Sequence, residues 1–213
     1  MMASSTPTLY TPSNKQECQA AVRKLSRETV ISLDAEGVQL GKDGPLTLLQ
    51  IGTLDGTVYL FDVMINEKKQ DKKFFTETGL NAILTSTKII KVAHLVIQEH
   101  EGRKLPAREK LADICKMYSE NAEVYEGKED VKLEWSKLAG NFWAKRPMTK
   151  EMLDYASADV TALIPEVYET QNRYIRENGI FDLFEERVQE EIELEIDPNA
   201  KERRKERTAH IRM

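Results

Sequence analysis

The stretch TVISLDAEG, residues 29–37, predicts a strand on which the interpretation of the whole chain rests. β-Branched and aliphatic residues favour an extended backbone, and Gly37 ends the run. Because strand side chains alternate between the two faces of a sheet, Asp34 and Glu36 point to the same face. Two carboxylates on an apolar strand are costly unless a cation meets them, which suggests a Mg²⁺ or Mn²⁺ site. The alternative is a strand end where both acids contact water.

Three more strand-like stretches follow. LTLLQIGT (46–53) comes after turn residues 41–45, and TVYLFDV (57–63) comes after the Asp-Gly pair at 55–56, which is typical of a hairpin. Together with residues 29–37, these two stretches predict three consecutive antiparallel strands. KIIKV (88–92) predicts a fourth, short strand.

Helical patterns dominate the remaining sequence. Ser13 and Gln16 predict a capping box at the start of the first helix. Thr149 is the expected N-cap of a late helix, and Pro165 is expected to restart it. Gly179 is expected to end the segment that follows. The predicted helices cover residues 15–25, 72–84, 107–118 and 150–164, with a short helix after residue 132.

The 213 residues are enough for one domain with a substantial core. We expect a disordered leader over residues 1–12, the domain over 13–180 and a charged tail over 181–213. A net charge of −5 argues against a protein that coats nucleic acids indiscriminately, but it is compatible with an acidic metal site beside local basic patches.

The sequence predicts neither a secretory signal nor a membrane span, because no long apolar run is present. Cys18 and Cys115 lack paired spacing and are expected to be free thiols. Free thiols fit a reducing compartment, so we expect the protein in the cytoplasm, with the nucleus as the alternative.

A second candidate for chemistry lies in DYASADV, residues 154–160. Tyr155 and Asp159 are four residues apart and therefore lie on one face of the predicted helix. An acid at a metal and a phenol one turn away can together orient a water molecule. The alternative is a pair on the solvated surface.

The two candidates together resemble the active-site motifs of the DEDDy 3′–5′ exonuclease superfamily, which includes ribonuclease D, the Werner syndrome exonuclease and the polymerase proofreading domain. LTLLQIGT adds to the resemblance. The stretch FWAKRPMTKEMLDYASADV (142–160) is similar to the ribonuclease D-type run W-x-x-R-P-L-T-x-x-M-x-x-Y-A-x-x-D-V, with Met148 in place of the commoner leucine. The resemblance covers roughly residues 29–174. LDAEG and the charged tail resemble the exonuclease 3′–5′ domain-containing, Egalitarian-like branch, which implies germline RNA handling and a homodimer.

This resemblance implies an α/β, ribonuclease H-like fold with a mixed central sheet flanked by helices. It implies that Asp34, Glu36 and Asp159 bind metal and that Tyr155 orients the attacking water. Two Mg²⁺ or Mn²⁺ ions about 3.5–4 Å apart would then cleave the 3′ end of RNA or single-stranded DNA. Arg146 is a candidate phosphate contact, and a structural ion pair is an equal alternative for it.

One carboxylate of the family's site is missing from the sequence. The second family motif supplies an aspartate just past the fourth strand. If His94 marks that motif, Leu95 occupies the aspartate position, and leucine cannot bind a metal. A second alignment fits better: about 25 residues, carrying a strand and a helix, are absent between Val92 and Ala93.

Either alignment predicts hydrolysis that is greatly weakened or absent. A catalytically inactive RNA-binding or dimerising scaffold is therefore the competing hypothesis. Weak candidates to replace the missing ligand are Glu99, Glu101 and Asp113, while His94 and His100 lack metal-ligand spacing.

Two further features have a functional and a structural interpretation. Trp135, Phe142 and Trp143 either stack on bases or pack in the core, and core packing is the stronger interpretation. Residues 201–212, KERRKERTAHIR, either contact phosphates or form a mixed-charge solvated helix, and the interrupting glutamates favour the helix.

Overall fold

The structure, a computed structural model, describes residues 7–38, 40, 44–93, 97–98, 107–108, 111–119, 128–138, 141–197 and 199. The strands are β1 (Thr8–Tyr10), β2 (Val30–Gly37), β3 (Leu46–Thr53), β4 (Val58–Asp62), β5 (Met64–Asn66), β6 (Lys69–Gln70), β7 (Ile90–Ala93), β8 (Ile97–Gln98) and β9 (Ala107–Arg108). The α-helices are α1 (Lys15–Leu25), α2 (Phe74–Thr78), α3 (Leu80–Thr85), α4 (Leu111–Tyr118), α5 (Lys128–Lys137), α6 (Lys150–Thr161), α7 (Glu166–Glu177) and α8 (Phe181–Ile196), and the 3₁₀ turns are η1 (Pro12–Asn14) and η2 (Phe142–Ala144).

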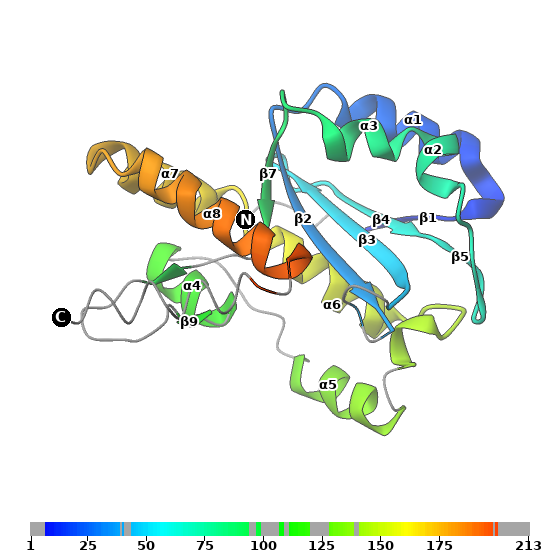
Figure 1. Ribbon diagram of the computed structural model, residues 1–213. Coiled ribbons are helices and arrows are strands. Elements are labelled where there is room, and N and C mark those ends of the chain that lie inside the picture. Colours follow the sequence, from blue (N-terminus) through cyan, green and yellow to red (C-terminus); the bar gives the residue numbers. More distant parts are fainter. Residues whose placement is uncertain are drawn as a thin grey trace.

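A five-stranded sheet in the order β1-β4-β3-β2-β7 forms the centre of the fold. Strands β2, β3 and β4 are successive antiparallel neighbours, whereas β1 and β7 run parallel to their partners. Helices α1, α2 and α3 cover one face of this sheet, and α6 crosses the other (Figure 1). The predicted antiparallel strands and the mixed, helix-flanked sheet are confirmed.

The N-terminal part of the chain differs from its prediction. Thr8–Tyr10 forms β1 and pairs in parallel with β4, and the Tyr10 ring stacks on Phe61 with 5.1 Å between centroids. The predicted disorder is therefore wrong for this strand, because pairing with a distant strand decides its conformation. Residues 1–6 of the expected leader lie outside the described residues.

Two local predictions also need correction. The N-cap of α1 is Asn14, whose side chain accepts a hydrogen bond from Glu17 N, and not Ser13. The single helix expected over 72–84 is divided into α2 and α3 at Gly79, whose φ of 85° lies in the left-handed region. By contrast, Thr149 caps α6 as predicted, because its hydroxyl accepts from Met152 N.

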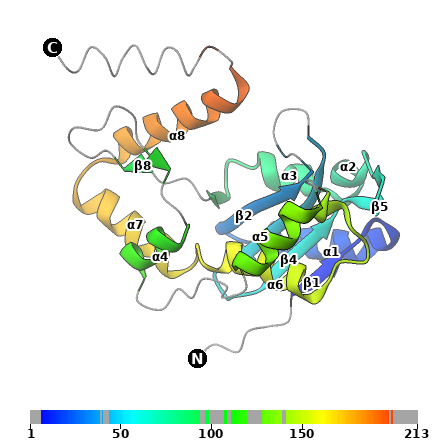
Figure 2. The same cartoon turned by 90° about the horizontal axis from the view of Figure 1, so that it is seen from below.

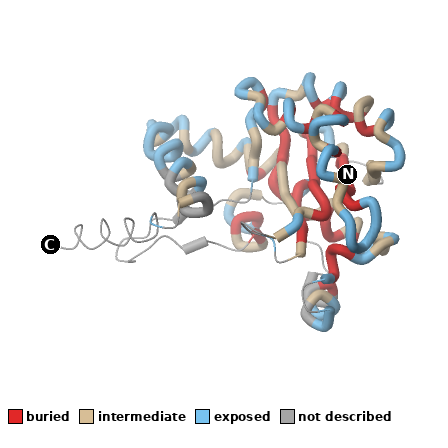
Figure 3. Tube along the Cα trace, turned by 45° about the vertical axis from the view of Figure 1, so that its right-hand side comes forward, coloured by how far each residue is buried: buried red, intermediate tan, exposed pale blue. Residues whose placement is uncertain are grey.

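The two faces of the sheet bury different clusters. The strands of the central sheet are mostly buried (Figure 3). The face toward α1–α3 holds a hydrophobic cluster, which contains Cys18, Ala21, Val22, Leu25, Ile31, Leu49, Ile51, Tyr59, Phe61, Val63, Phe74, Leu80, Ile83 and Ile89. The face toward α6 holds a second cluster: Leu48, Val58, Leu60, Val131, Phe142, Trp143, Met152, Tyr155, Ala156 and Val160.

A third cluster joins α4, α7 and the turn that precedes α7, and Val92 of β7 packs against it. Helices α4, α7 and α8 accordingly lie together on one side of the sheet (Figure 2). Cys18 and Cys115 are both free and buried, as predicted. Burial raises the pKa of the Cys18 thiol to about 11. Across the described residues, none of the helices combines the length and apolarity that crossing a membrane requires.

Candidate metal centre

Strand β2 presents alternate side chains to α6, and the prediction that Asp34 and Glu36 share one face is confirmed. Asp34 lies opposite Gln50 of β3, and Glu36 lies opposite Leu48. Leu48 belongs to the cluster under α6, so both carboxylates point into the layer between the sheet and this helix.

Helix α6 approaches β2 closely because two small residues leave room for it. The Ser32 hydroxyl donates to the carbonyl oxygen of Val160 at 2.8 Å. A Cβ atom on Gly52, the register partner of Ser32, would lie 2.6 Å from the Ser32 hydroxyl oxygen and 3.4 Å from Val160. A larger residue at position 52 would push the helix outward. This contact fixes Val160, and with it the neighbouring Asp159, against β2.

Three carboxylates converge at this contact. Asp34, Glu36 and Asp159 each place a carboxylate oxygen so that the three oxygens lie within 4.8 Å of one another. Glu36 and Asp159 are both 8% exposed, so a purely solvated arrangement is wrong for these two acids. Like charges held this close repel, and burial increases the cost. A set of oxygen donors with this charge fits Mg²⁺ or Mn²⁺.

Tyr155 lies one turn before Asp159 on α6, as predicted. Its side chain is 5% exposed, which excludes the surface pair that the sequence left open. The ring packs at a tilt against Trp143, with 5.7 Å between centroids. The aromatic contact holds the phenol in place, while its role in orienting water remains a prediction.

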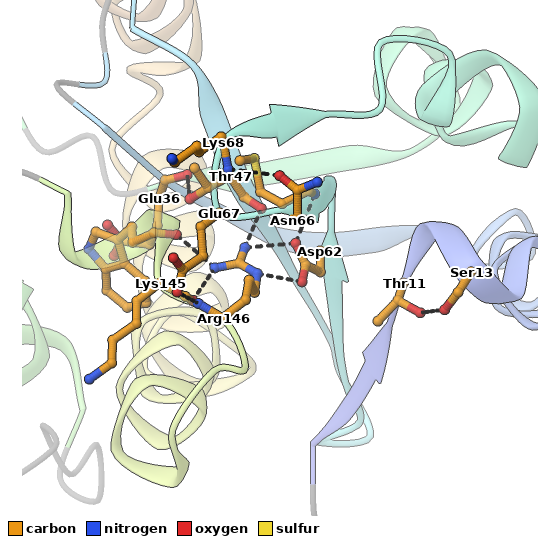
Figure 4. A network of polar contacts seen from close by, with 12 residues as sticks. Thr11, Ser13, Glu36, Thr47, Asp62, Asn66, Glu67, Lys68, Lys145 and Arg146 are labelled. Atoms are coloured by element: carbon orange, nitrogen blue, oxygen red, sulfur yellow. Dashed lines mark hydrogen bonds and ion pairs between the residues drawn. The ribbon is translucent and has the colours of Figure 1, made fainter.

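Arg146 makes a bidentate ion pair with Asp62, the last residue of β4 (Figure 4). Nε donates to Oδ2 and Nη2 donates to Oδ1 of Asp62, both at 2.7 Å. The other donors go to backbone carbonyls of Trp143, Lys145 and Thr47. All five N–H groups of the guanidinium are thus used within the chain. The ion pair, one of the two alternatives for Arg146, is present, and a phosphate contact would require breaking one of these bonds.

The Arg146 network also reaches the acidic strand. The Thr47 hydroxyl donates to the backbone carbonyl of Glu36 at 3.1 Å, and the Thr47 carbonyl accepts from Arg146. Arg146 N donates to Glu67, which lies in the turn between β5 and β6. The R-P-M-T stretch therefore ties the start of α6 to β3 and β4, and this fixes the angle at which the helix crosses the acids.

The aromatic residues of the same stretch form core rather than a base-stacking surface. Trp143 is fully buried and Phe142 is 7% exposed. Trp143 meets Phe142 and Trp135 edge to face, with centroids 5.2 Å and 6.4 Å apart. The core interpretation is confirmed for Phe142 and Trp143.

The remaining candidates do not join the cluster. Asp113 is on α4 and is not among the three grouped acids of the described residues. His94, Leu95, Glu99, His100 and Glu101 lie outside the described residues, as do residues 201–212.

Sequence reasoning missed two residues of this face, Asp62 and Gln50. Asp62 ends an otherwise apolar strand, just as Asp34 interrupts one, but nothing in the sequence around it identifies Arg146 as its partner. Gln50 lies within the strand LTLLQIGT, and no local pattern indicates a role for it. The alternation of side chains along β3 would have placed it beside Asp34.

Several solved structures resemble the chain, whereas no family model and no curated protein sequence matches it. Ribonuclease D from Trypanosoma brucei aligns with a TM-score of 0.59 and 19% identity, over 76% of this chain and 63% of that chain. Its complex with RNA U12 aligns with a TM-score of 0.54 and 18% identity, over 73% of this chain and 60% of that chain. The catalytic core of T. brucei RRP6, in its C496S mutant, aligns with a TM-score of 0.51 and 20% identity, over 88% of this chain and 56% of that chain.

These similarities show the fold. The chain has the ribonuclease H-like fold of the ribonuclease D-type exonucleases, as the resemblance implied. Its match spans 55–63% of the length of the T. brucei ribonuclease D chains.

Proposed function

We propose that this chain is a metal-dependent 3′–5′ exonuclease-type domain that binds the 3′ end of RNA or single-stranded DNA, with hydrolysis weakened by a missing fourth carboxylate. One observation carries the proposal: carboxylate oxygens of Asp34, Glu36 and Asp159 gather within 4.8 Å in a ribonuclease D-like fold. T. brucei ribonuclease D with this fold has been solved with GMP and with RNA U12, which supports a nucleic-acid 3′ end as the ligand here.

In this proposal the residues of the site have different roles. Asp34 and Glu36 from β2, and Asp159 from α6, would hold Mg²⁺ or Mn²⁺. The bound cation would offset the negative charge of the site toward a polyanion and activate water as the nucleophile. Tyr155 would orient that water through its hydroxyl, because packing against Trp143 fixes its ring. Arg146 acts indirectly, since it holds the start of α6 in place.

The weakened hydrolysis follows from the number of acids. Among the described residues, the cluster contains three carboxylates, and the family's second motif would supply a fourth. Strand β7, after which that motif is expected, is at the edge of the sheet. We propose that the segment after Val92 is shortened and that the fourth ligand is lost with it. The resemblance of LDAEG and of the charged tail supports a place in the Egalitarian-like branch.

A shortening assay tests the proposal. Purified protein is incubated with 5′-labelled single-stranded RNA and Mn²⁺, beside an Asp34→Ala variant. We expect slow loss of nucleotides from the 3′ end that Asp34→Ala abolishes. Tyr155→Phe, which keeps the ring contact with Trp143, should retain RNA binding and lose shortening.

Asp113→Asn is the matched control, because it removes an acid of the same charge from α4, outside the cluster. This variant should shorten RNA at the rate of the unmodified chain. Shortening that survives Asp34→Ala would show that the nuclease activity does not come from this cluster and would refute the proposal.

The second candidate function is a catalytically inactive RNA-binding scaffold. The three-carboxylate cluster of the described residues favours it, because a two-metal site generally needs more ligands. RNA retention without any shortening, at high protein concentration and in Mn²⁺, would support the scaffold over the exonuclease. Size-exclusion chromatography with light scattering would then test whether the scaffold is a dimer.

A further inference from the structure

Gln50 is a buried polar residue without an evident purpose in the fold. Its side chain is 0% exposed, and among the described residues neither its Oε1 nor its Nε2 has a hydrogen-bond partner. Other buried polar side chains of the same face are bonded: Ser32 to Val160, and Asp62 to Arg146. Leaving a buried amide without hydrogen bonds is costly. The burial of Gln50 therefore needs an explanation, whereas the hydrogen bonds of Ser32 and Asp62 already account for theirs.

The register of the sheet places Gln50 beside the candidate metal centre. It lies directly opposite Asp34 on β2, and opposite Leu60 on β4 at its other side. Directly opposed residues of antiparallel strands point to the same face, with Cβ atoms about 4.5–5.5 Å apart. The Gln50 amide is therefore in the layer between the sheet and α6, within reach of the Asp34 side chain.

A second unpaired group belongs to this layer. Trp143 Nε1 is buried and has no hydrogen-bond partner among the described residues. Its ring packs in the cluster that contains Leu48 and Leu60, the residues that flank Gln50 on this face. An indole N–H can only donate, so the acceptor oxygen of the Gln50 amide complements it.

We propose that Gln50 is a positioning residue for the carboxylate cluster. When a divalent cation is bound, Nε2 of Gln50 donates to the Asp34 carboxylate oxygen that does not contact the cation, and Oε1 faces the Trp143 indole. This inference rests on the cation site proposed above. Hydrogen bonds of this kind orient ligating carboxylates, and their loss typically weakens metal binding. An amide suits the position, because it supplies a donor without a positive charge that would compete with the cation.

The test uses the Gln50→Met variant, which keeps the length of the side chain and removes the amide. Mn²⁺ affinity is measured by isothermal titration calorimetry on the whole chain, and thermal unfolding is followed without metal. Leu60→Met is the matched control, because Leu60 is the neighbour of Gln50 on the side away from the acids. We expect about tenfold or greater weakening of Mn²⁺ binding by Gln50→Met and little change by Leu60→Met.

The metal-free measurement separates positioning from packing. A purely structural glutamine would leave the Mn²⁺ affinity unchanged whatever it does to unfolding. Equal Mn²⁺ affinity of Gln50→Met and the unmodified chain would therefore overturn the inference while leaving the cation site intact. If the unmodified chain itself fails to bind Mn²⁺, the proposed function fails, and this inference fails with it.

A measurement on the unmodified chain covers the case in which Gln50→Met does not fold. The assigned side-chain amide signals of Gln50 and Gln70 are followed by NMR during a Mg²⁺ titration. Gln70 is the internal control, because its amide already donates to the carbonyl of Leu46, the first residue of β3. We expect the Gln50 signals to shift with saturation and those of Gln70 to stay in place. Unchanged Gln50 signals at saturating Mg²⁺ would contradict the inference.

Discussion

The two faces of the central sheet are built from the same strands but bury different kinds of side chain. Neighbouring residues of β3 show the contrast: Ile51 points into the apolar cluster under α1–α3, and Gln50 points toward α6 and the acids. Both side chains are completely buried. One face stabilises the sheet by excluding water, whereas the other buries polar groups that are costly in themselves. The carboxylates and Gln50 lie on the same buried face, and this supports the proposed metal centre there.

This comparison predicts its largest effect on metal binding at Asp159. Asp159→Asn removes one charge of three, so Mn²⁺ affinity measured by calorimetry should fall about 100-fold or more, equivalent to about 2.8 kcal/mol. Because the substitution removes the repulsion between Asp159 and the two remaining acids, the thermal midpoint of the metal-free protein should not decrease. If Asp159→Asn bound Mn²⁺ with the affinity of the unmodified chain, Asp159 would not be a ligand of the proposed site.

The ion pair of Arg146 and Asp62 should be the most sensitive stabilising contact on the polar face. Arg146→Met leaves a buried carboxylate without its counter-charge, so the free energy of unfolding should fall by about 3–5 kcal/mol. Urea titration measures this change. Adding Asp62→Asn should recover part of the loss, since it removes the uncompensated charge. A single variant as stable as the unmodified chain would show that the pair does not hold α6.

A substitution on the apolar face should separate stability from function. Ile51→Ala removes a fully buried side chain and should lower the free energy of unfolding by about 2–5 kcal/mol. The Mn²⁺ affinity of the folded fraction should not change, because Ile51 points away from the acids. If Ile51→Ala weakened metal binding as much as Gln50→Met, the functional distinction between the two faces would be wrong.

The smallest effect is expected at the start of α6. Thr149→Ala removes the N-cap acceptor for Met152 N and should cost about 1 kcal/mol in urea unfolding. Thr149→Ser, which retains a hydroxyl acceptor, is the matched control and should be close to the unmodified chain. Equal loss in both variants would assign the effect to the methyl group rather than to the cap.

Local patterns in the sequence were enough to predict each half of the site. Alternation along a strand placed Asp34 and Glu36 on one face, and helical spacing placed Tyr155 one turn from Asp159. Their convergence came from the family resemblance, because spacing within an element carries no information on which elements meet. The contact itself depends on Ser32 and Gly52, whose role becomes visible only when α6 packs on the sheet.

Other features depended on tertiary contacts that no local pattern encodes. The three residues of β1 are too short a run to stand out, and their pairing with β4 decides their conformation. The choice between an ion pair and a phosphate contact for Arg146 required the position of Asp62. The unpaired amide of Gln50 required both the strand register and the burial of its neighbours.

The most direct test of the account is to locate manganese in the molecule. Crystals of the whole chain are soaked in Mn²⁺, and anomalous differences are recorded near the manganese absorption edge. We expect a peak between the carboxylates of Asp34, Glu36 and Asp159. A peak elsewhere, with none at these three acids, would contradict the assignment of this face as a metal centre.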